Sequence, residues 1–241
     1  MSRKMPSRAI VLAAGLGTRM RPITDTMPKP LVKVGGQTMI DRALDALARA
    51  GVGRVVVNVH HFADQMIAHL ARHGDFVTIS DESDRLLDSA GGVVKALPLL
   101  GGTPFLLLNA DSFWIDGESS ELERLALAWN DDAMDILLML SPLDTATGHN
   151  GKADFNMDET GRLSRAADRA TGLVYAGAAI LHPRIFAGAS AEPHGLNLYF
   201  DRAITTGRLF GLPMRGPWFT VGTPEAIFES EAVLDRLGES P

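Results

Sequence analysis

The chain has 241 residues, of which 46% are hydrophobic and 22% are charged, and none is cysteine. This composition is typical of a soluble globular protein, and the lack of cysteine excludes disulfides, thiolate zinc sites and cysteine nucleophiles. The formal net charge of −6 argues against a general nucleic-acid binder. The apolar run at residues 9–14 is too short for a signal peptide or a membrane span, so we expect a cytoplasmic protein.

Strands and helices are predicted to alternate through the first 140 residues. Apolar runs predict strands at 9–14, 54–59, 76–80, 104–109 and 135–140, and helical spacing predicts helices at 38–50, 63–72, 91–97 and 122–129. Gly51 and Pro98 are expected to end the first and third of these helices. The alternation is typical of a doubly wound α/β sheet, in which ligands bind at the carboxyl ends of the strands.

The pattern changes after Pro142. Strands are expected at 151–157, 172–181, 209–213 and 218–221, and helices at 197–206 and from 224 onward. Thr223 is the expected N-cap of the last helix, with Pro224 as its first residue. We expect this half to extend the same sheet in an antiparallel or mixed arrangement, because no linker separates it from the first half.

A glycine-rich loop follows the first predicted strand, and it reads GLGTRMRPITDTMPKP from Gly15 onward. Gly15 and Gly17 allow the backbone to approach a phosphate closely, and Arg19 and Lys29 supply positive charge. The loop lacks the lysine of a P-loop, and Met20 stands where a dinucleotide-binding fingerprint needs its third glycine. The combination predicts a phosphate site, and the alternative interpretation is a solvated, positively charged loop.

Asp111 lies just after the strand predicted at 104–109, in the string Asn109-Ala110-Asp111. A carboxylate at the carboxyl end of a strand can hold Mg²⁺ against phosphate oxygens. A local turn cap is the alternative interpretation. Because the glycine-rich loop is expected at the same edge of the sheet, metal binding is the favoured one.

The string from Leu12 to Val32, LAAGLGTRMRPITDTMPKPLV, resembles the signature of the sugar-phosphate nucleotidyltransferase family. Its members include uridylyl-, thymidylyl- and guanylyltransferases, and this short chain is most similar to the N-acetylmuramate-1-phosphate uridylyltransferases of peptidoglycan recycling. The resemblance implies a Rossmann-like mixed sheet of the glycosyltransferase-A-like nucleotidyltransferase fold and a Mg²⁺ cofactor. The implied reaction transfers a nucleoside monophosphate from a nucleoside triphosphate, UTP in the first place, to a sugar 1-phosphate such as N-acetylmuramate 1-phosphate, and pyrophosphate leaves.

The resemblance also implies how the chain is divided and what it binds. We expect a single nucleotidyltransferase domain, with the nucleotide-binding part at about 1–140 and the sugar-binding part at about 141–241. The expected partners are a nucleoside triphosphate and a sugar 1-phosphate, without nucleic acid or membrane. The chain itself is expected to be a monomer or a small homo-oligomer.

Three residues receive catalytic roles from the resemblance. Arg19 is expected to neutralise the leaving pyrophosphate, Lys29 to contact the α-phosphate or the incoming phosphate, and Asp111 to ligate Mg²⁺. The expected nucleotide-binding residues are Leu12, Ala13, Ala14, Gly15, Gly17, Thr18, Arg19, Lys29, Asn58, Asp88, Ser89, Gly91 and Asn109. Asp88 is expected to accept a hydrogen bond from a ring N–H of uracil or guanine, and a helix N-cap by Asp88 or Ser89 is the alternative.

The sugar is expected to contact Asp154, Gly177 and Trp218, all of which resemble family positions. Turn or core packing is the alternative role for each of them. Thr220 departs from the family, because most relatives carry a second magnesium-binding Asp there. One metal on Asp111 can suffice, a water can bridge Thr220 to the ion, or activity is reduced. The rival functions are guanylyl transfer to mannose 1-phosphate or a heptose phosphate, cytidylyl transfer to phosphocholine, and a non-catalytic nucleotide-sugar sensor.

Overall fold

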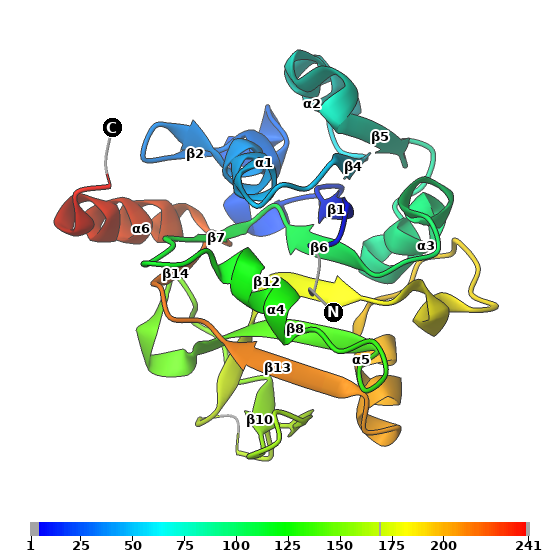
Figure 1. Ribbon diagram of the computed structural model, residues 1–241. Coiled ribbons are helices and arrows are strands. Elements are labelled where there is room, and N and C mark those ends of the chain that lie inside the picture. The colour runs from blue at the N-terminus through cyan, green and yellow to red at the C-terminus, as the bar shows by residue number, and fades with distance from the viewer. Residues whose placement is uncertain (1–4, 169, 240–241) are drawn as a thin grey trace.

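The computed structural model describes residues 5–168 and 170–239, and nine strands of this part form one sheet (Figure 1). Four of them come from the first half of the chain: β1 (Arg8–Leu12), β4 (Arg54–Val59), β5 (Val77–Asp81) and β6 (Phe105–Asn109). They pair in parallel in the order β6-β1-β4-β5. Their carboxyl ends therefore lie along one edge of the sheet.

The second half of the chain extends this sheet. It supplies β8 (Ile136–Pro142), β10 (Phe155–Met157), β11 (Leu163–Arg165), β12 (Leu173–Leu181) and β13 (Leu209–Pro213). β12 joins the halves, because it runs antiparallel to β6 on one side and to β8 on the other. β13 pairs in parallel with β8, whereas β10 and β11 form an antiparallel edge. The predicted mixed sheet is thus confirmed.

Helices cover both faces of the sheet, as the doubly wound pattern predicts. They are α1 (Met39–Arg49), α2 (Ala63–Leu70), α3 (Asp88–Leu100), α4 (Glu121–Ala128) and α5 (Asn197–Thr205). A further helix, α6 (Pro224–Leu237), contacts strands outside this sheet. α1, α2 and α4 pack with Val11 and Val57 in one apolar cluster. α3 and α5 pack with Ile10 and Val56 in another. Successive strand residues are therefore buried on opposite faces. No helix of the described residues is long and apolar enough to cross a membrane.

A small second sheet anchors the glycine-rich loop. It consists of β7 (Ser112–Trp114), β14 (Trp218–Thr220) and β9 (Ala146–Thr147), and β2 (Lys33–Val34) and β3 (Gln37–Thr38) form a hairpin nearby. Phe113 stacks on Phe219 with ring centroids 4.6 Å apart, and both belong to an apolar cluster with Met20 of the loop and Leu234 of α6. The loop between β1 and α1 is folded into three short 3₁₀ turns, η1 (Thr18–Met20), η2 (Ile23–Asp25) and η3 (Lys29–Leu31).

Two predicted elements were wrong in their bounds. Pro98 does not end its helix: α3 starts earlier, at Asp88, and continues to Leu100. The missing N–H of proline costs one hydrogen bond near the end of the helix, and the N–H of Gly101 then closes the turn on the Leu97 carbonyl at 2.9 Å. The strand expected at 151–157 is reduced to β10, because the Asp154 side chain takes the Tyr175 N–H that a strand neighbour would pair with.

Candidate functional site

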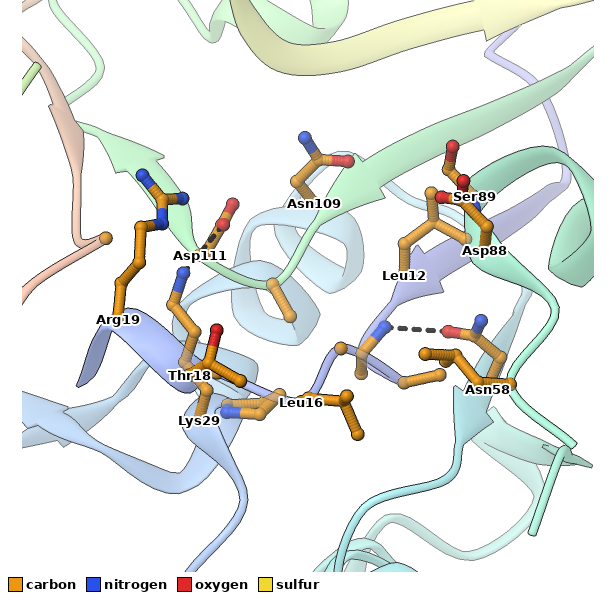
Figure 2. Close-up of a pocket in the computed structure, with 18 residues that line it drawn as sticks. Leu12, Leu16, Thr18, Arg19, Lys29, Asn58, Asp88, Ser89, Asn109 and Asp111 are labelled. Atoms are coloured by element: carbon orange, nitrogen blue, oxygen red, sulfur yellow. Dashed lines mark hydrogen bonds and ion pairs between the residues drawn. The ribbon is translucent and has the colours of Figure 1, made fainter. Parts of the chain in front are cut away.

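A cleft of about 490 Å³ lies at the carboxyl ends of β1, β4 and β6. Its lining residues are Leu12, Ala13, Ala14, Gly15, Leu16, Gly17, Thr18, Arg19, Lys29, Pro30, Asn58, Leu86, Asp88, Ser89, Asn109, Ala110, Asp111 and Gly222 (Figure 2). The structure thus brings together every residue expected at the nucleotide except Gly91, and it adds Asp111. Leu16, Pro30, Leu86, Ala110 and Gly222 were not singled out from the sequence.

Gly15 and Gly17 occur in the loop for different structural reasons. Gly17 has φ 63°, and a Cβ atom there would lie 2.9 Å from Thr24 Cγ2 and 3.0 Å from Lys29 Cβ. Thr24 also donates a hydrogen bond of 2.8 Å from Oγ1 to the Gly17 carbonyl. A Cβ at Gly15 would meet no atom within 4 Å. Packing and backbone conformation therefore explain Gly17, whereas Gly15 leaves its backbone open to the cleft.

Asn58 joins three segments beneath the cleft. Its Oδ1 accepts a hydrogen bond of 2.7 Å from the Ala13 N–H (Figure 2). Its Nδ2 donates one of 2.7 Å to Glu82 Oε1. Glu82 is 1% exposed, and its other carboxylate oxygen accepts from the Leu87 N–H. Burial raises the pKa of the Glu82 carboxyl above its ordinary value, although the hydrogen bond from Asn58 acts in the opposite direction. Asn58 therefore positions the loop through its backbone, and its partner Glu82 was missed because it stands outside any motif.

Two cations and one carboxylate meet at one end of the cleft (Figure 2). Lys29 Nζ donates to Asp111 Oδ2 at 2.8 Å, and the side chains are 12% and 38% exposed. A Cβ atom at Gly222 would lie 3.5 Å from both terminal nitrogens of Arg19, so the guanidinium packs against this glycine. Arg19 forms no ion pair with the described residues. Its charge is therefore available to an anionic ligand.

The oxygen ligands at this end of the cleft fit a magnesium ion whose coordination shell is completed by phosphate oxygens. No group of three or more histidine and carboxylate side chains that could hold a metal occurs among the described residues. Mg²⁺ usually takes one or two protein carboxylates together with phosphates and water. Asp111 uses one carboxylate oxygen, Oδ2, for the hydrogen bond from Lys29. Thr220 pairs with Ser112, the residue after Asp111, but it does not line the cleft.

A second cavity of about 300 Å³ shares Asp88, Ser89 and Asn109 with the cleft. Its other lining residues are Asp154, Phe155, Arg165, Tyr175, Gly195, Leu196, Asn197 and Phe200. These residues come from β10, β11, β12 and α5 or from the loops beside them, all in the second half of the chain. Two adjacent compartments therefore meet at three polar residues, which is the arrangement that a reaction of two substrates needs.

Of the three residues expected at the sugar, only Asp154 lines this cavity, and its Oδ2 accepts a hydrogen bond of 3.0 Å from the Tyr175 N–H. Trp218 is 3% exposed and donates from Nε1 to the Ala176 carbonyl at 2.9 Å. A Cβ at Gly177, whose φ is 79°, would lie 2.2 Å from Ser112 Oγ. Gly177 and Trp218 are thus placed by packing and line neither cavity.

Gly91 also lies outside both linings. A Cβ there would come 2.2 Å from the Glu192 carbonyl oxygen, so this glycine lets residues 192–194 pack against α3. The His194 carbonyl accepts hydrogen bonds from the N–H groups of Ala90 and Gly91 at 3.0 and 3.2 Å. The contact closes the first turn of α3 beside the junction of the two cavities.

Asp88 lies at that junction with an uncommon backbone conformation. Its φ is 59°, a region that few residues other than glycine adopt and that often occurs at functional sites. The alternative interpretation, a helix N-cap by Asp88 or Ser89, is wrong, because Leu87 occupies the N-cap position and makes no side-chain cap. Instead Asp88 Oδ1 accepts from the Ser89 N–H, and Ser89 Oγ accepts from the Leu196 N–H at 3.0 Å.

Tyr175 and Arg165 are two of the lining residues of the second cavity that were not expected from the sequence. The buried hydroxyl of Tyr175 has no hydrogen-bond partner among the described residues. Burial, and after it the charge of Asp111, raises the pKa of this phenol far above its ordinary value, so it stays a neutral donor. Arg165 is the other one, and it donates to Asp201 and Asn197. Neither belongs to a motif, so only the tertiary structure reveals them.

The chain is similar to known proteins over most of its length. The family of MobA-like NTP transferase domains matches residues 9–143. The chain is 40% identical to the N-acetylmuramate alpha-1-phosphate uridylyltransferase of Caulobacter vibrioides, with 98% of each chain covered. It is 31% identical to the protein of that name from Neisseria meningitidis serogroup B, over 94% of this chain and 97% of the relative. HddC from Yersinia pseudotuberculosis, solved in complex with GMP-PN, has the same fold, with a TM-score of 0.76 at 20% identity over 95% of this chain and 99% of that one.

Proposed function

The chain belongs to the family of MobA-like NTP transferase domains, and on this premise we propose that it transfers uridine monophosphate from UTP to N-acetylmuramate 1-phosphate and releases pyrophosphate. The observation that carries the proposal is the cleft, where a glycine-rich loop, Arg19, Lys29 and Asp111 converge beside a second cavity. The two relatives of 40% and 31% identity support the choice of base and sugar. Nucleoside triphosphates are cytoplasmic metabolites, so we place the reaction, and the peptidoglycan recycling it would serve, in the cytoplasm.

We assign the nucleoside triphosphate to the cleft and the sugar ring to the second cavity. The open backbone at Gly15 and the charges of Arg19 and Lys29 support the first assignment. The aromatic and polar lining of the second cavity, with Asp154 among its residues, supports the other. Asp88, Ser89 and Asn109 line both, so the reacting groups would meet beside them.

In the proposed reaction, an oxygen of the sugar phosphate attacks the α-phosphorus in line, and the bond from this phosphorus to the pyrophosphate oxygen breaks. The attacking phosphate is already anionic, so the reaction needs no strong general base. Catalysis is then positioning and charge neutralisation. Arg19 would neutralise the leaving pyrophosphate, and Lys29 would hold the α-phosphate or the incoming phosphate.

Asp111 is the residue that would hold Mg²⁺, together with phosphate oxygens of the substrates. When bound, the ion supplies positive charge to the phosphates. The neutral Thr220 supplies no second carboxylate, so we propose a site with one protein carboxylate. The position of Lys29 on Asp111 fits this arrangement, because the lysine holds the carboxylate oriented within the cleft.

A matrix of substrates tests the proposed function. UTP, GTP, CTP and dTTP are each combined with N-acetylmuramate 1-phosphate, N-acetylglucosamine 1-phosphate, mannose 1-phosphate, a heptose phosphate and phosphocholine, and pyrophosphate release is measured with Mg²⁺. We expect the highest kcat/KM for UTP with N-acetylmuramate 1-phosphate. A higher kcat/KM for GTP with mannose 1-phosphate or a heptose phosphate would favour guanylyl transfer over the proposed function. A higher kcat/KM for CTP with phosphocholine would favour cytidylyl transfer. Nucleotide binding without pyrophosphate from any pair, even with Mn²⁺, would indicate a sensor.

A further inference from the structure

Arg165, the last residue of β11, is the only lining residue of the second cavity with a positive charge among the described part of the chain. Its guanidinium is held on several sides. Nε donates to Asp201 Oδ1 at 2.8 Å, Nη2 donates to Asn197 Oδ1 at 2.9 Å, and the Phe155 ring centroid lies 4.8 Å from the guanidinium carbon. A planar guanidinium fixed in this way loses little freedom when it binds a further group.

The guanidinium has donors left for a ligand. Of its five N–H groups, the bonds to Asp201 and Asn197 use two, and Nη1 makes no hydrogen bond to the described residues. The Arg165 and Asp201 side chains are 39% and 59% exposed, so solvent screens their attraction. Asp201 therefore orients Arg165 without cancelling its ability to bind another anion.

Among the described residues, no cation other than Arg165 lines this cavity, and Asp88 brings a carboxylate to it. A neutral sugar needs no cation there, whereas a sugar with its own negative charge would need a positive charge to meet it. The phosphate groups of the two substrates already have Lys29 and Arg19 in the cleft (Figure 2). Arg165 is thus a cation in the sugar compartment that the reaction at phosphorus does not require.

Resting on the proposed function, we propose that Arg165 binds a carboxylate carried by the sugar ring and so selects acidic sugar 1-phosphates over neutral ones. The carboxylate would face the guanidinium and accept charge-assisted hydrogen bonds from it, a geometry that arginine provides and lysine does not. N-acetylmuramate meets this requirement, because it carries a lactyl ether carboxylate on O3. N-acetylglucosamine differs from it only in lacking the lactyl group.

This pair of 1-phosphates provides the test. With UTP, Arg165→Gln is expected to lower kcat/KM for N-acetylmuramate 1-phosphate about 10- to 100-fold, chiefly through KM, because a charge-assisted hydrogen bond is lost. The values for N-acetylglucosamine 1-phosphate and the KM for UTP should stay unchanged. Arg165→Lys keeps the positive charge but loses the planar guanidinium with its paired donors. Its kcat/KM for N-acetylmuramate 1-phosphate should therefore lie between those of the wild type and Arg165→Gln. Arg162→Gln is the matched control, since Arg162 lies in the same hairpin and over the Phe210 ring but lines neither cavity.

Direct binding separates this inference from the proposed function. Calorimetry of the two sugar phosphates without nucleotide should show a preference for the acidic one in the wild type and in Arg162→Gln, and its loss in Arg165→Gln. If Arg165→Gln loses affinity equally for both sugar phosphates, or keeps the preference for the acidic one, the role of Arg165 is overturned. A wild type that shows no preference overturns it too. Absence of pyrophosphate from every substrate pair, with the binding preference intact, overturns the proposed transfer and leaves acidic-sugar recognition standing.

Discussion

Lys29 Nζ lies 2.8 Å from Asp111 Oδ2, so the last cation of the glycine-rich loop meets the first carboxylate after β6, 82 residues further along the chain. Lys29 reaches this point from η3, between Pro28 and Pro30, and Asp111 from the carboxyl end of the neighbouring strand. The pair joins the two segments that the proposed reaction requires in one place. It also explains how a single carboxylate stays oriented in a half-open cleft.

Asp111→Asn is expected to lower kcat by about 10³-fold or more, because the charge that a metal brings to phosphates stabilises the transition state by several kcal/mol. The amide keeps the size of the side chain and can still accept from Lys29, so the melting temperature should change little. The measurement is kcat as a function of Mg²⁺ concentration, and a chelator should abolish wild-type turnover. A variant with wild-type kcat at the same Mg²⁺ concentration would show that Asp111 is not the metal ligand.

Arg19→Ala is expected to lower kcat by about 10²- to 10³-fold, the usual loss when one preorganised donor to a developing charge is removed. Arg21→Ala is the matched control from the same loop. The Arg21 side chain is 66% exposed, pairs with Asp25 at 3.2 Å and does not line the cleft, so its loss should leave kcat nearly unchanged. Steady-state kinetics with saturating substrates compares the two, and equal losses would contradict the role given to Arg19.

Tyr175→Phe is expected to preserve or raise the melting temperature. The hydroxyl is buried without a partner among the described residues, and burying such a group costs stability. The ring stays packed edge-on against Phe200, at 5.7 Å between centroids. Tyr199→Phe is the control, because the Tyr199 hydroxyl is bonded to His194 Nε2 at 2.9 Å and its removal should cost about 1 kcal/mol. Scanning calorimetry measures the melting temperatures of both variants. Equal destabilisation by the two substitutions would contradict the prediction.

Glu82→Gln is expected to change how stability depends on pH. Burial raises the folded-state pKa of Glu82 above its unfolded value, so its favourable contribution is complete below the unfolded pKa and is lost as pH rises through the folded one. The wild type should therefore lose unfolding free energy relative to the variant as pH increases. Urea denaturation of both proteins from about pH 4 to about pH 8 measures this, and parallel profiles would contradict it.

The first half of the fold could be predicted because buried parallel strands are continuous apolar runs. β1 leads into Gly15, β4 carries Asn58 next to its last residue, and β6 ends at Asn109, and these residues line the cleft as expected. Helix ends were less predictable. α3 begins at Asp88, whose positive φ no apolar pattern reveals, and it continues past Pro98 to Leu100.

The second compartment could be predicted only in part. Its lining comes from short strands, and the pairing of β12 with β8 shifts register between Tyr175 and Ala179. A shift of this kind changes which side chains face the cavity, so Tyr175 could not be placed from residue spacing. Arg165 lies in β11, a strand of three residues that the sequence did not predict. Trp218 illustrates the converse case, since its family position suggested a sugar contact and its indole is buried against Ala176.

The fate of the phosphate oxygens tests the central claim most directly. N-acetylmuramate 1-phosphate with a heavy oxygen isotope in its non-bridging phosphate oxygens is incubated with unlabelled UTP and Mg²⁺, and the products are analysed by phosphorus NMR and mass spectrometry. Attack of the sugar phosphate on the α-phosphorus predicts a nucleotide sugar with the heavy isotope in the oxygen that bridges its two phosphorus atoms, and pyrophosphate without label. A nucleotide sugar with an unlabelled bridge, labelled pyrophosphate, or no nucleotide sugar at all would contradict the account.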